Sequence, residues 1–471
     1  MKTSSINIKY IRDAHVRFDG SYHLSEGVMC KQLVNSSPYG LLKIEDAAER
    51  IFNGNRIKRV YISNKEYGLP FLSSSDILCT DLDNVKYASR RYTSSIEDMT
   101  LGEGWTLITR SGTIGNCAYT NKQHAQKLAS EDVIRLIPNN ILKGGYVYAY
   151  LASKYGYAML TQGTFGGVIQ HIEPDFVGSI PIPKLPENFQ SEVDDLVKES
   201  AKLRSDATEL LKEAERILKS EASLKDLTPE DYDYFGPRVS GRKLAFFTKS
   251  IKEIGTTTIN AFNHSKRIQL LKDSICCHTQ PLKDVIENGQ TFSSTGVPSV
   301  EVAEGKGIML INQKDIFDNI VKGKWISKRG VKIENLVEYG EVIIASDGTL
   351  GENELFCRTL FANESLVGSF LSSHFIRMKT TSEVPSGYLY CWLNSDYGFR
   401  FIRSTQAGTK ICHPINKILM EIPVPMIARD KMEEIDRMVR EAHTMRYQAN
   451  QKELKAIAMV EAEIEKWKKL K

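Results

Sequence analysis

The sequence lacks the signatures of metal-binding and membrane proteins. Its 471 residues include eight cysteines, but none form a Cys-x-x-Cys pair and no Cys/His cluster has zinc-ligand spacing. Cys276, Cys277 and His278 form the tightest group, and adjacent side chains point apart, so free thiols are expected there. No run approaches the ~20 apolar residues that span a bilayer. The N-terminal stretch also lacks the apolar core of a signal peptide. We therefore expect a cytoplasmic protein.

Motifs for methyl transfer and nucleotide hydrolysis are missing as well. A DNA adenine methyltransferase needs an Asn/Asp-Pro-Pro-aromatic loop, and the nearest stretch, 35–39, reads Asn-Ser-Ser-Pro-Tyr without the first proline. The phosphate-binding pattern GxxxxGK[ST] is absent, because Gly and Trp follow the Gly-Lys pairs at Lys306 and Lys324. These absences argue against a catalytic chain that carries its own cofactor.

Two weaker catalytic possibilities remain. A nuclease of the Pro-Asp…Glu-x-Lys type would have to combine Pro174-Asp175 with Glu304-Gly305-Lys306, which lies far downstream. His171 and His413 occupy matching places in the two halves of the chain, which leaves a shared catalytic role open. Neither histidine has a nucleophile at a recognisable spacing, and a hydrogen-bonded turn residue explains the duplication more simply.

Length and charge set broad bounds on the protein. A chain of 471 residues predicts two or three domains. The 62 basic and 58 acidic residues leave a net charge of only +4. Such a balance does not require a nucleic-acid partner, but a basic stripe can be hidden within a nearly neutral total.

The second half of the chain repeats the first. Five blocks recur in the same order, and small changes in their spacing are what loop insertions produce. The repeat is half the chain long, which indicates a duplicated domain rather than a solenoid. The matching blocks are Asp19–His23 with Asn260–His264, Gly68–Leu72 with Gly307–Ile311, Leu107–Asn116 with Ile343–Glu352, Gly145–Gly156 with Gly387–Gly398, and Gly166–Pro183 with Gly408–Pro425.

The block at Leu107–Asn116, LITRSGTIGN, contains a Gly-Thr-apolar-Gly element that returns in the second copy. Two glycines separated by two residues suit a phosphate loop or a turn after a strand, but the block has no lysine for phosphate. We therefore favour the turn. The aromatic block GYVYAYLASKYGYAML reads as one helix whose tyrosines serve packing rather than base stacking.

Each repeat ends in a long helix with seven-residue periodicity. This narrow seam is typical of a coiled coil, and leucine in one helix against alanine in the other favours pairing of the two. Each helix spans ~35–40 residues, which gives a rod of ~50–60 Å. The seam positions are Leu196, Leu203, Leu210, Ile217 and Leu224 in the first helix and Ile435, Met438, Ala442, Met445, Ala449 and Ala456 in the second.

The expected organisation alternates globular domains with these helices. Short apolar runs between Gly, Ser and Asn turns predict strands, so the expected class is α+β with a pseudo-two-fold internal repeat. The first domain is expected at 1–186 and its helix at 187–226. The second domain is expected at 227–427 and its helix at 428–471.

Basic and amide side chains recur on the predicted loops of both domains. Arginine and lysine neutralise phosphates, while glutamine, asparagine and arginine can read base edges, so these residues are candidates for DNA contact. A solvated polar face is the alternative for any single residue. The candidates are Arg56, Lys58, Arg59, Arg90, Arg91, Arg110, Thr161, Gln162 and Thr164 in the first copy, and Lys322, Lys324, Lys328, Arg329, Thr405, Gln406, Thr409 and Lys410 in the second.

Over essentially its whole length the chain resembles the specificity (S) subunit of type I restriction–modification systems. The resemblance rests on the Gly68–Leu72 block, the Arg110–Gly115 block, the Ile-Pro-Ile-Pro run and the order in which the blocks repeat. It implies two target-recognition domains, an antiparallel coiled coil and no catalytic site. It also implies double-stranded DNA, two methyltransferase subunits and restriction subunits as partners. S-adenosylmethionine, ATP and Mg²⁺ would then act in those partners.

The second copy departs from the first at one notable position. Ser346 stands where Arg110 stands, so a base contact by Arg110 does not carry over to the second domain. Two domains that differ in this way predict an asymmetric, bipartite DNA target. The alternatives are a target-recognition subunit of another methylation-based phage-defence system, a scaffold that acts through its coiled coil, or an enzyme with an unrecognised site.

Overall fold

The computed structural model describes residues 8–13, 18, 20–56, 58–162, 164, 171–228, 248–254, 257–294 and 300–469. The chain divides into two compact units. Unit 1 comprises Met1–Ser205 and Gln448–Lys471, and unit 2 comprises Asp206–Tyr447. Each unit therefore combines one globular head with half of each long helix. We call the globular parts head 1, which ends at Pro183, and head 2, which ends at Pro425.

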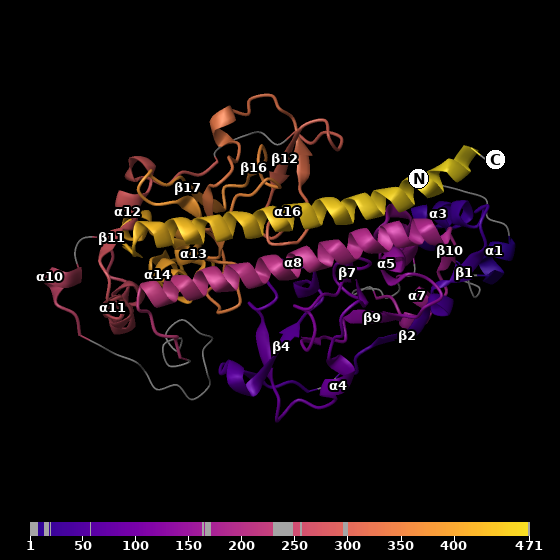
Figure 1. The fold of residues 1–471 in the computed structure, drawn as a ribbon, viewed down its shortest axis with the longest axis horizontal. Coiled ribbons are helices and arrows are strands. Elements are labelled where there is room, and N and C mark those ends of the chain that lie inside the picture. The colour runs from indigo at the N-terminus through magenta and orange to yellow at the C-terminus, as the bar shows by residue number, and fades with distance from the viewer. Residues whose placement is uncertain are drawn as a thin grey trace. The chain divides into compact units, whose positions relative to one another are not determined.

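The two long helices are α8 (Glu187–Glu221) and α16 (Arg429–Lys466), which run side by side in Figure 1. Unit 1 holds the N-terminal half of α8 with the C-terminal half of α16, so the pair is antiparallel. Ser223, two residues beyond the end of α8, has a φ of 50°, which lies in the left-handed region. The amide of Leu224 donates to the carbonyl of Lys219 at 2.8 Å, and that of Ser223 to Ser220 at 3.2 Å. These two bonds form a Schellman motif that satisfies the last carbonyls of the helix.

The buried line between the helices follows their small residues. In α16, Ile435, Ala442, Ala449 and Ala456 are fully buried, as the periodicity predicts. In α8 the fully buried positions include Ala207 and Ala214, whereas the predicted leucine positions Leu196, Leu203, Leu210, Ile217 and Leu224 are half-buried. Met438 and Met445 are half-buried as well. The leucines thus flank a core of small side chains, which lets the two backbones approach closely.

This packing makes Ala456 sensitive to side-chain size. We expect Ala456→Leu to lower the free energy of unfolding by about 1–3 kcal/mol, because extra methylenes in a packed seam force backbone or rotamer shifts. Ala458 lies two residues further along the same helix and is exposed. Ala458→Leu is therefore a matched control with nearly no effect in urea unfolding of the full chain. Equal losses in the two variants would show that residue 456 does not lie in the seam.

Head 1 is built on two four-stranded sheets. One has the order β2-β9-β6-β7 and the other β3-β5-β4-β8, in which β4 and β8 are parallel. The strands are β1 (Leu41–Lys43), β2 (Ala48–Asn53), β3 (Tyr61–Ile62), β4 (Gly68–Leu72), β5 (Lys86–Ser89), β6 (Thr106–Thr109), β7 (Cys117–Tyr119), β8 (Leu128–Ala129), β9 (Val133–Pro138) and β10 (Pro181–Pro183). The helices are α1 (Ile8–Asp13), α2 (Gly20–His23), α3 (Glu26–Val34), α4 (Ile96–Met99), α5 (Gly144–Ala152), α6 (Lys154–Gln162) and α7 (Pro174–Gly178).

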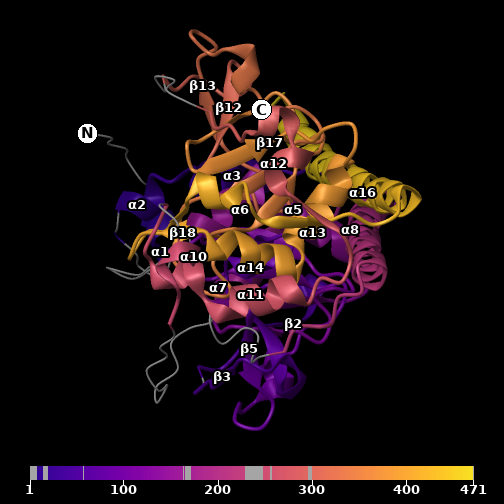
Figure 2. The ribbon, with the colours of Figure 1, turned by 90° about the vertical axis from the view of Figure 1, so that its left-hand side faces the viewer.

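Head 2 repeats this arrangement with shorter sheets. β14 lies between β15 and β17, as β6 lies between β7 and β9, and β12 is parallel to β16, as β4 is to β8. The strands are β11 (Thr279–Pro281), β12 (Ile308–Ile311), β13 (Lys324–Ile326), β14 (Val342–Ala345), β15 (Thr359–Phe361), β16 (Phe370–Leu371), β17 (Phe375–Met378), β18 (Gln406–Ala407), β19 (His413–Pro414) and β20 (Pro423–Pro425). The helices are α10 (Ile251–Ile254), α11 (Lys266–Asp273), α12 (Leu282–Val285), α13 (Ser386–Asn394), α14 (Asp396–Ser404) and α15 (Asn416–Leu419), with α11 against α14 in Figure 2.

The aromatic block forms two helices, α5 and α6, and the prediction of one continuous helix is wrong. Ser153 is extended, and its hydroxyl donates to the carbonyl of Tyr150 at 2.6 Å. The same oxygen accepts from the amide of Gly156 at 3.3 Å, so this serine ends α5 and caps α6. A Cβ on Gly156 would lie 2.3 Å from the carbonyl oxygen of Tyr150, which only glycine avoids. Ser395 and Gly398 repeat the break in head 2.

The tyrosines of the block serve packing, as expected. Tyr146 is fully buried, and its hydroxyl donates to the carbonyl of Pro183 at 2.6 Å. Tyr388 does the same to Pro425 in head 2, also at 2.6 Å. In each head, a hydrogen bond thus joins the helix after the central sheet to the Pro-x-Pro strand that leads into the long helix. The duplicated sequence therefore gives duplicated packing, and the α+β fold with two paired helices is confirmed.

Candidate nucleic-acid interface

The Gly-Thr blocks lie where the central strands of the two sheets end. In head 1 the block forms the turn between β6 and β7, and Gly112 and Gly115 have φ values of 74° and 84°. The amide of Gly115 donates to the carbonyl of Thr109 at 3.0 Å, which closes the turn. Because these glycines shape a hairpin, the expectation of a turn rather than a phosphate loop is confirmed. The residues just before them, however, join a polar cluster.

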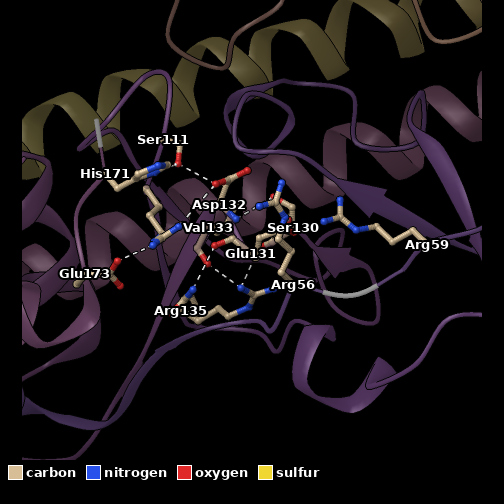
Figure 3. Close-up of polar contacts among 12 residues, drawn as sticks. Arg56, Arg59, Ser111, Ser130, Glu131, Asp132, Val133, Arg135, His171 and Glu173 are labelled. Atoms are coloured by element: carbon tan, nitrogen blue, oxygen red, sulfur yellow. Dashed lines mark hydrogen bonds and ion pairs between the residues drawn. The ribbon is translucent and has the colours of Figure 1, made fainter. Parts of the chain in front are cut away.

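This cluster forms where β6 ends and β9 begins, and Figure 3 shows most of its members. The amide of Arg110 donates to the carbonyl of Asp132 at 2.8 Å, and Ser111 forms an isolated β-bridge with His171. The Ser111 hydroxyl lies 2.7 Å from Asp132 Oδ1 and 2.7 Å from His171 Nδ1. Three segments far apart in the sequence therefore meet through one serine.

The hydrogen bonds of Ser111 fix the direction of each donor. A serine hydroxyl has one proton and an ionised carboxylate can only accept, so Ser111 donates to Asp132. His171 Nδ1 must then donate to the serine oxygen. A nucleophilic serine would need to give its proton to the histidine instead. The arrangement orients the histidine, and it is not the geometry of an activated nucleophile.

Carboxylates hold two of the predicted arginines in this region and lie near a third. Arg110 Nη2 lies 2.5 Å from Glu173 Oε1, and its side chain is only 18% exposed. Arg59 pairs with Glu131 and stacks over Phe71, with 4.7 Å between the guanidinium carbon and the ring centroid. Burial alone would lower the pKa of Arg59, but hydrogen bonds with Tyr61 and Glu131 outweigh it and raise the pKa. Arg56 lies 3.9 Å from Glu131 and is largely exposed.

Head 2 builds a different cluster on the same backbone frame. The amide of Ser346 donates to the carbonyl of His374 at 2.9 Å, as that of Arg110 does to Asp132. Asp347 Oδ2 accepts from His374 Nδ1 at 2.8 Å and from the Ser346 hydroxyl at 3.1 Å. In head 1 the carboxylate of Asp132 precedes β9, whereas in head 2 the carboxylate of Asp347 follows β14. His374 occupies the position that corresponds to Asp132. The two heads share a scaffold but present different chemistry.

The other predicted residues fall into exposed and buried groups. Thr405 is fully buried, and Gln162 and Gln406 are nearly so. These three side chains are therefore not exposed for contact with DNA. Thr161 and Thr164 are half-buried, and the Thr161 hydroxyl donates to the carbonyl of Tyr157 at 2.9 Å. The rest of the Gly163–Gln170 stretch lies outside the described residues, apart from Thr164. The exposed candidates are Arg56, Lys58, Arg90, Arg91, Lys322, Lys324, Lys328, Arg329, Thr409 and Lys410, of which Lys324 pairs with Glu301.

Sequence reasoning missed Lys86 and Tyr61 on the β3-β5-β4 sheet, and Tyr92 beside the predicted Arg91. Lys86 lies over the ring of exposed Tyr61, with 5.4 Å from its nitrogen to the ring centroid, and Arg91 lies at the same distance over Tyr92. β5 shows no alternation that could have revealed them, because Lys86 and Ala88 share one face of the strand although the first is exposed and the second is buried. Basic and aromatic side chains together can contact phosphates and bases.

The described residues place limits on other chemistry. Among them, no three His, Cys, Asp or Glu side chains gather as a possible metal site. None of the described helices combines the length and apolarity needed to cross a bilayer. Cys276 is exposed and Cys277 is half-buried, and both are free thiols. Burial raises the pKa of the Cys277 thiol, so it is a poor nucleophile at neutral pH.

Comparison with known proteins gives structural similarity without sequence matches. No protein-family model and no curated protein matches the sequence. The type I restriction–modification S subunit from M. genitalium is 13% identical, and the match covers 91% of this chain and 96% of that one with a TM-score of 0.36. The HsdS subunit from Thermoanaerobacter tengcongensis is 12% identical over 91% and 96%, with a TM-score of 0.27.

A further chain comes from a study of complex assembly and conformational transition in the type I R-M system. It is 13% identical, the match covers 92% of this chain and 98% of that one, and the TM-score is 0.27. Over more than nine-tenths of its length, the chain is similar in structure to specificity subunits of type I restriction–modification systems.

Proposed function

We propose that the chain is the sequence-specific DNA-binding subunit of a type I restriction–modification complex. Head 1 and head 2 read the two parts of an asymmetric, bipartite target. The subunit is cytoplasmic and non-catalytic, and it recruits two methyltransferase subunits and, through them, restriction subunits. S-adenosylmethionine, ATP and Mg²⁺ act in those partners. The domain bounds 1–186, 187–226, 227–427 and 428–471 belong to the same proposal.

One observation carries this proposal. The two heads use the same backbone frame at the ends of β6 and β14 but present different side chains there. In head 1 the frame carries Arg110 and Asp132, and in head 2 it carries Ser346 and His374. A duplicated scaffold with diverged loops is what two readers of different base sequences require.

The exposed basic side chains supply the contacts that do not depend on sequence. Arg90 and Arg91 lie beyond β5, next to exposed Tyr92, and Lys328 and Arg329 lie beyond β13 in the corresponding part of head 2. Such residues neutralise phosphates and release counterions, which gives affinity and register. Arg59 and Arg110, which carboxylates hold, are better placed to shape the loops. The sequence preference is then left to the polar clusters and neighbouring loops.

Salt-dependent binding to duplex DNA tests the proposal. We expect Arg90→Gln or Arg91→Gln to weaken binding to all duplexes alike and to reduce the slope of log K against log salt by about one each, because each loses one phosphate contact. Lys417, on α15, is exposed but outside the candidate set, so Lys417→Gln is the control. The measurement uses the full chain, alone and with methyltransferase subunits. Binding that does not respond to salt would contradict the proposal.

A further inference from the structure

Asp347 and His374 form an exposed but oriented pair in head 2. His374 lies in the loop between β16 and β17, and Asp347 follows β14. Asp347 Oδ2 lies 2.8 Å from His374 Nδ1, and the histidine side chain is 58% exposed. An exposed hydrogen-bonded pair of this kind contributes little to stability, because solvent competes for its groups and two side chains must be ordered. The pair therefore does little to stabilise the fold, although neighbouring hydrogen bonds fix its geometry.

Several bonds hold Asp347 in place. The side-chain amide of Gln313 bonds to the backbone of Asp347 on both sides: its oxygen accepts from the Asp347 amide at 3.3 Å, and its nitrogen donates to the Asp347 carbonyl at 2.5 Å. The Ser346 hydroxyl donates to the carboxylate, and the Ser346 amide bonds to the carbonyl of His374. These hydrogen bonds fix the direction of the exposed His374 ring before any ligand binds, as a contact residue for a ligand requires.

The carboxylate also fixes which ring nitrogen carries the proton. An ionised aspartate can only accept, so the proton of the neutral imidazole lies on Nδ1. The other nitrogen, Nε2, is then a hydrogen-bond acceptor. In the major groove the groups that donate to such an acceptor are the exocyclic amino groups of adenine (N6) and cytosine (N4). Head 1 differs at this place, because Ser111 separates the carboxylate of Asp132 from His171.

We propose that His374 reads one base of the target through Nε2, which accepts a hydrogen bond from the exocyclic amino group of an adenine or a cytosine. Asp347 is the positioning residue that sets the tautomer and the ring direction. The inference rests on the proposed DNA-binding function and assigns a specificity-determining residue to head 2. It predicts that the effect of His374 is confined to one base pair within one half of the bipartite target.

Selection from a randomised duplex library tests this assignment. The full chain with its methyltransferase subunits is compared with His374→Ala, Asp347→Asn and, as a matched control, His413→Ala, a second exposed histidine of head 2. We expect His374→Ala to lose a preference of roughly tenfold or more at one base pair. Asp347→Asn, which no longer enforces one tautomer, should lose part of the same preference. His413→Ala should keep the whole motif, and all variants should bind unrelated duplexes as the parent does.

Base analogues then identify the amino group. At the affected position, adenine is replaced by purine without the 6-amino group, or cytosine by the pyrimidine without the 4-amino group. The analogue should lower the affinity of the parent as much as His374→Ala does. It should not lower the affinity of that variant any further. A loss of affinity with the purine analogue identifies adenine as the donor, and a loss with the pyrimidine analogue identifies cytosine.

The possible failures can be told apart. A His374→Ala motif identical to that of the parent overturns the assignment and leaves the proposed function intact. An equal loss on every duplex also overturns it, because that is the behaviour of a phosphate contact. A parent complex with no sequence preference overturns the proposed function and the assignment together.

Discussion

Replacing Arg377 by alanine is expected to lower the free energy of unfolding by about 3–5 kcal/mol, because it leaves a buried charge without its partner. Arg377 and Glu341 are both 1% exposed. The guanidinium Nε lies 2.7 Å from Glu341 Oε2, and Nη2 lies 2.8 Å from Oε1. Further bonds reach the carbonyls of Asn335 and Leu336 at 2.8 and 2.7 Å. The ion pair thus ties β17 to the loops before β14, and chemical unfolding of the full chain measures the loss.

A double variant separates the charge from the packing. Arg377→Met with Glu341→Met removes both charges and should cost much less than Arg377→Ala, because no ion remains buried. The corresponding residue of head 1, Arg135, is a useful comparison. It donates to the carbonyls of Ser130 and Val133, and burial lowers its pKa to about 10. If the double variant were as unstable as Arg377→Ala, loss of packing rather than an isolated charge would be the cause.

Between pH 7 and pH 5 we expect buried His443 to cost the fold about 2 kcal/mol of stability. Its ring is enclosed by Phe361 and Tyr390, with centroid distances of 5.0 and 5.2 Å. Burial, and to a lesser extent the charge of Arg446, holds the pKa of His443 well below its ordinary value. The unfolded chain protonates this residue near pH 6.5, whereas the folded chain does not. Below that pH the unfolded state binds more protons, so stability falls as the pH falls.

Two variants isolate this effect in chemical unfolding at a series of pH values. His443→Phe, which fits among the aromatic rings, should remove the share of His443, while His413→Gln at the surface should leave the profile unchanged. A second contribution of the same sign should persist in unit 1, because burial lowers the pKa of His124 to about 3. A profile identical in His443→Phe and the parent would mean that this histidine is accessible to protons in the folded state.

The sequence was sufficient to predict the architecture, because its strongest signals are periodic and repeated. The five matching blocks predicted two similar heads, and the seven-residue spacing predicted two helices that pair. What the spacing could not show is how deeply each position is buried. The leucines of α8 flank the seam, and small residues such as Ala207 form its centre. Ser153 also broke the predicted aromatic helix, because its hydroxyl competes with the backbone for hydrogen bonds.

The polar clusters were harder to predict, because they join residues distant in the sequence. Nothing local to Asp347 points to His374, and nothing near Ser111 points to His171. The pairing of β14 with β17 brings Asp347 to His374, and an isolated β-bridge brings Ser111 to His171. Thr405 and Gln406 were also expected on an exposed loop because their side chains are polar, but both are buried. Nothing in the sequence around Arg377 points to its ion pair with Glu341, because that contact depends on the packing of separate loops.

The most direct test of the central claim is the pattern of DNA methylation in cells that carry the chain with its methyltransferase subunits. Methylation-sensitive sequencing should show a motif of two short, different blocks separated by a fixed unread gap. Exchanging head 1 for a head of different sequence should change one block and leave the other block unchanged. A single contiguous motif, or a methylation pattern that persists when the chain is deleted, would contradict the account.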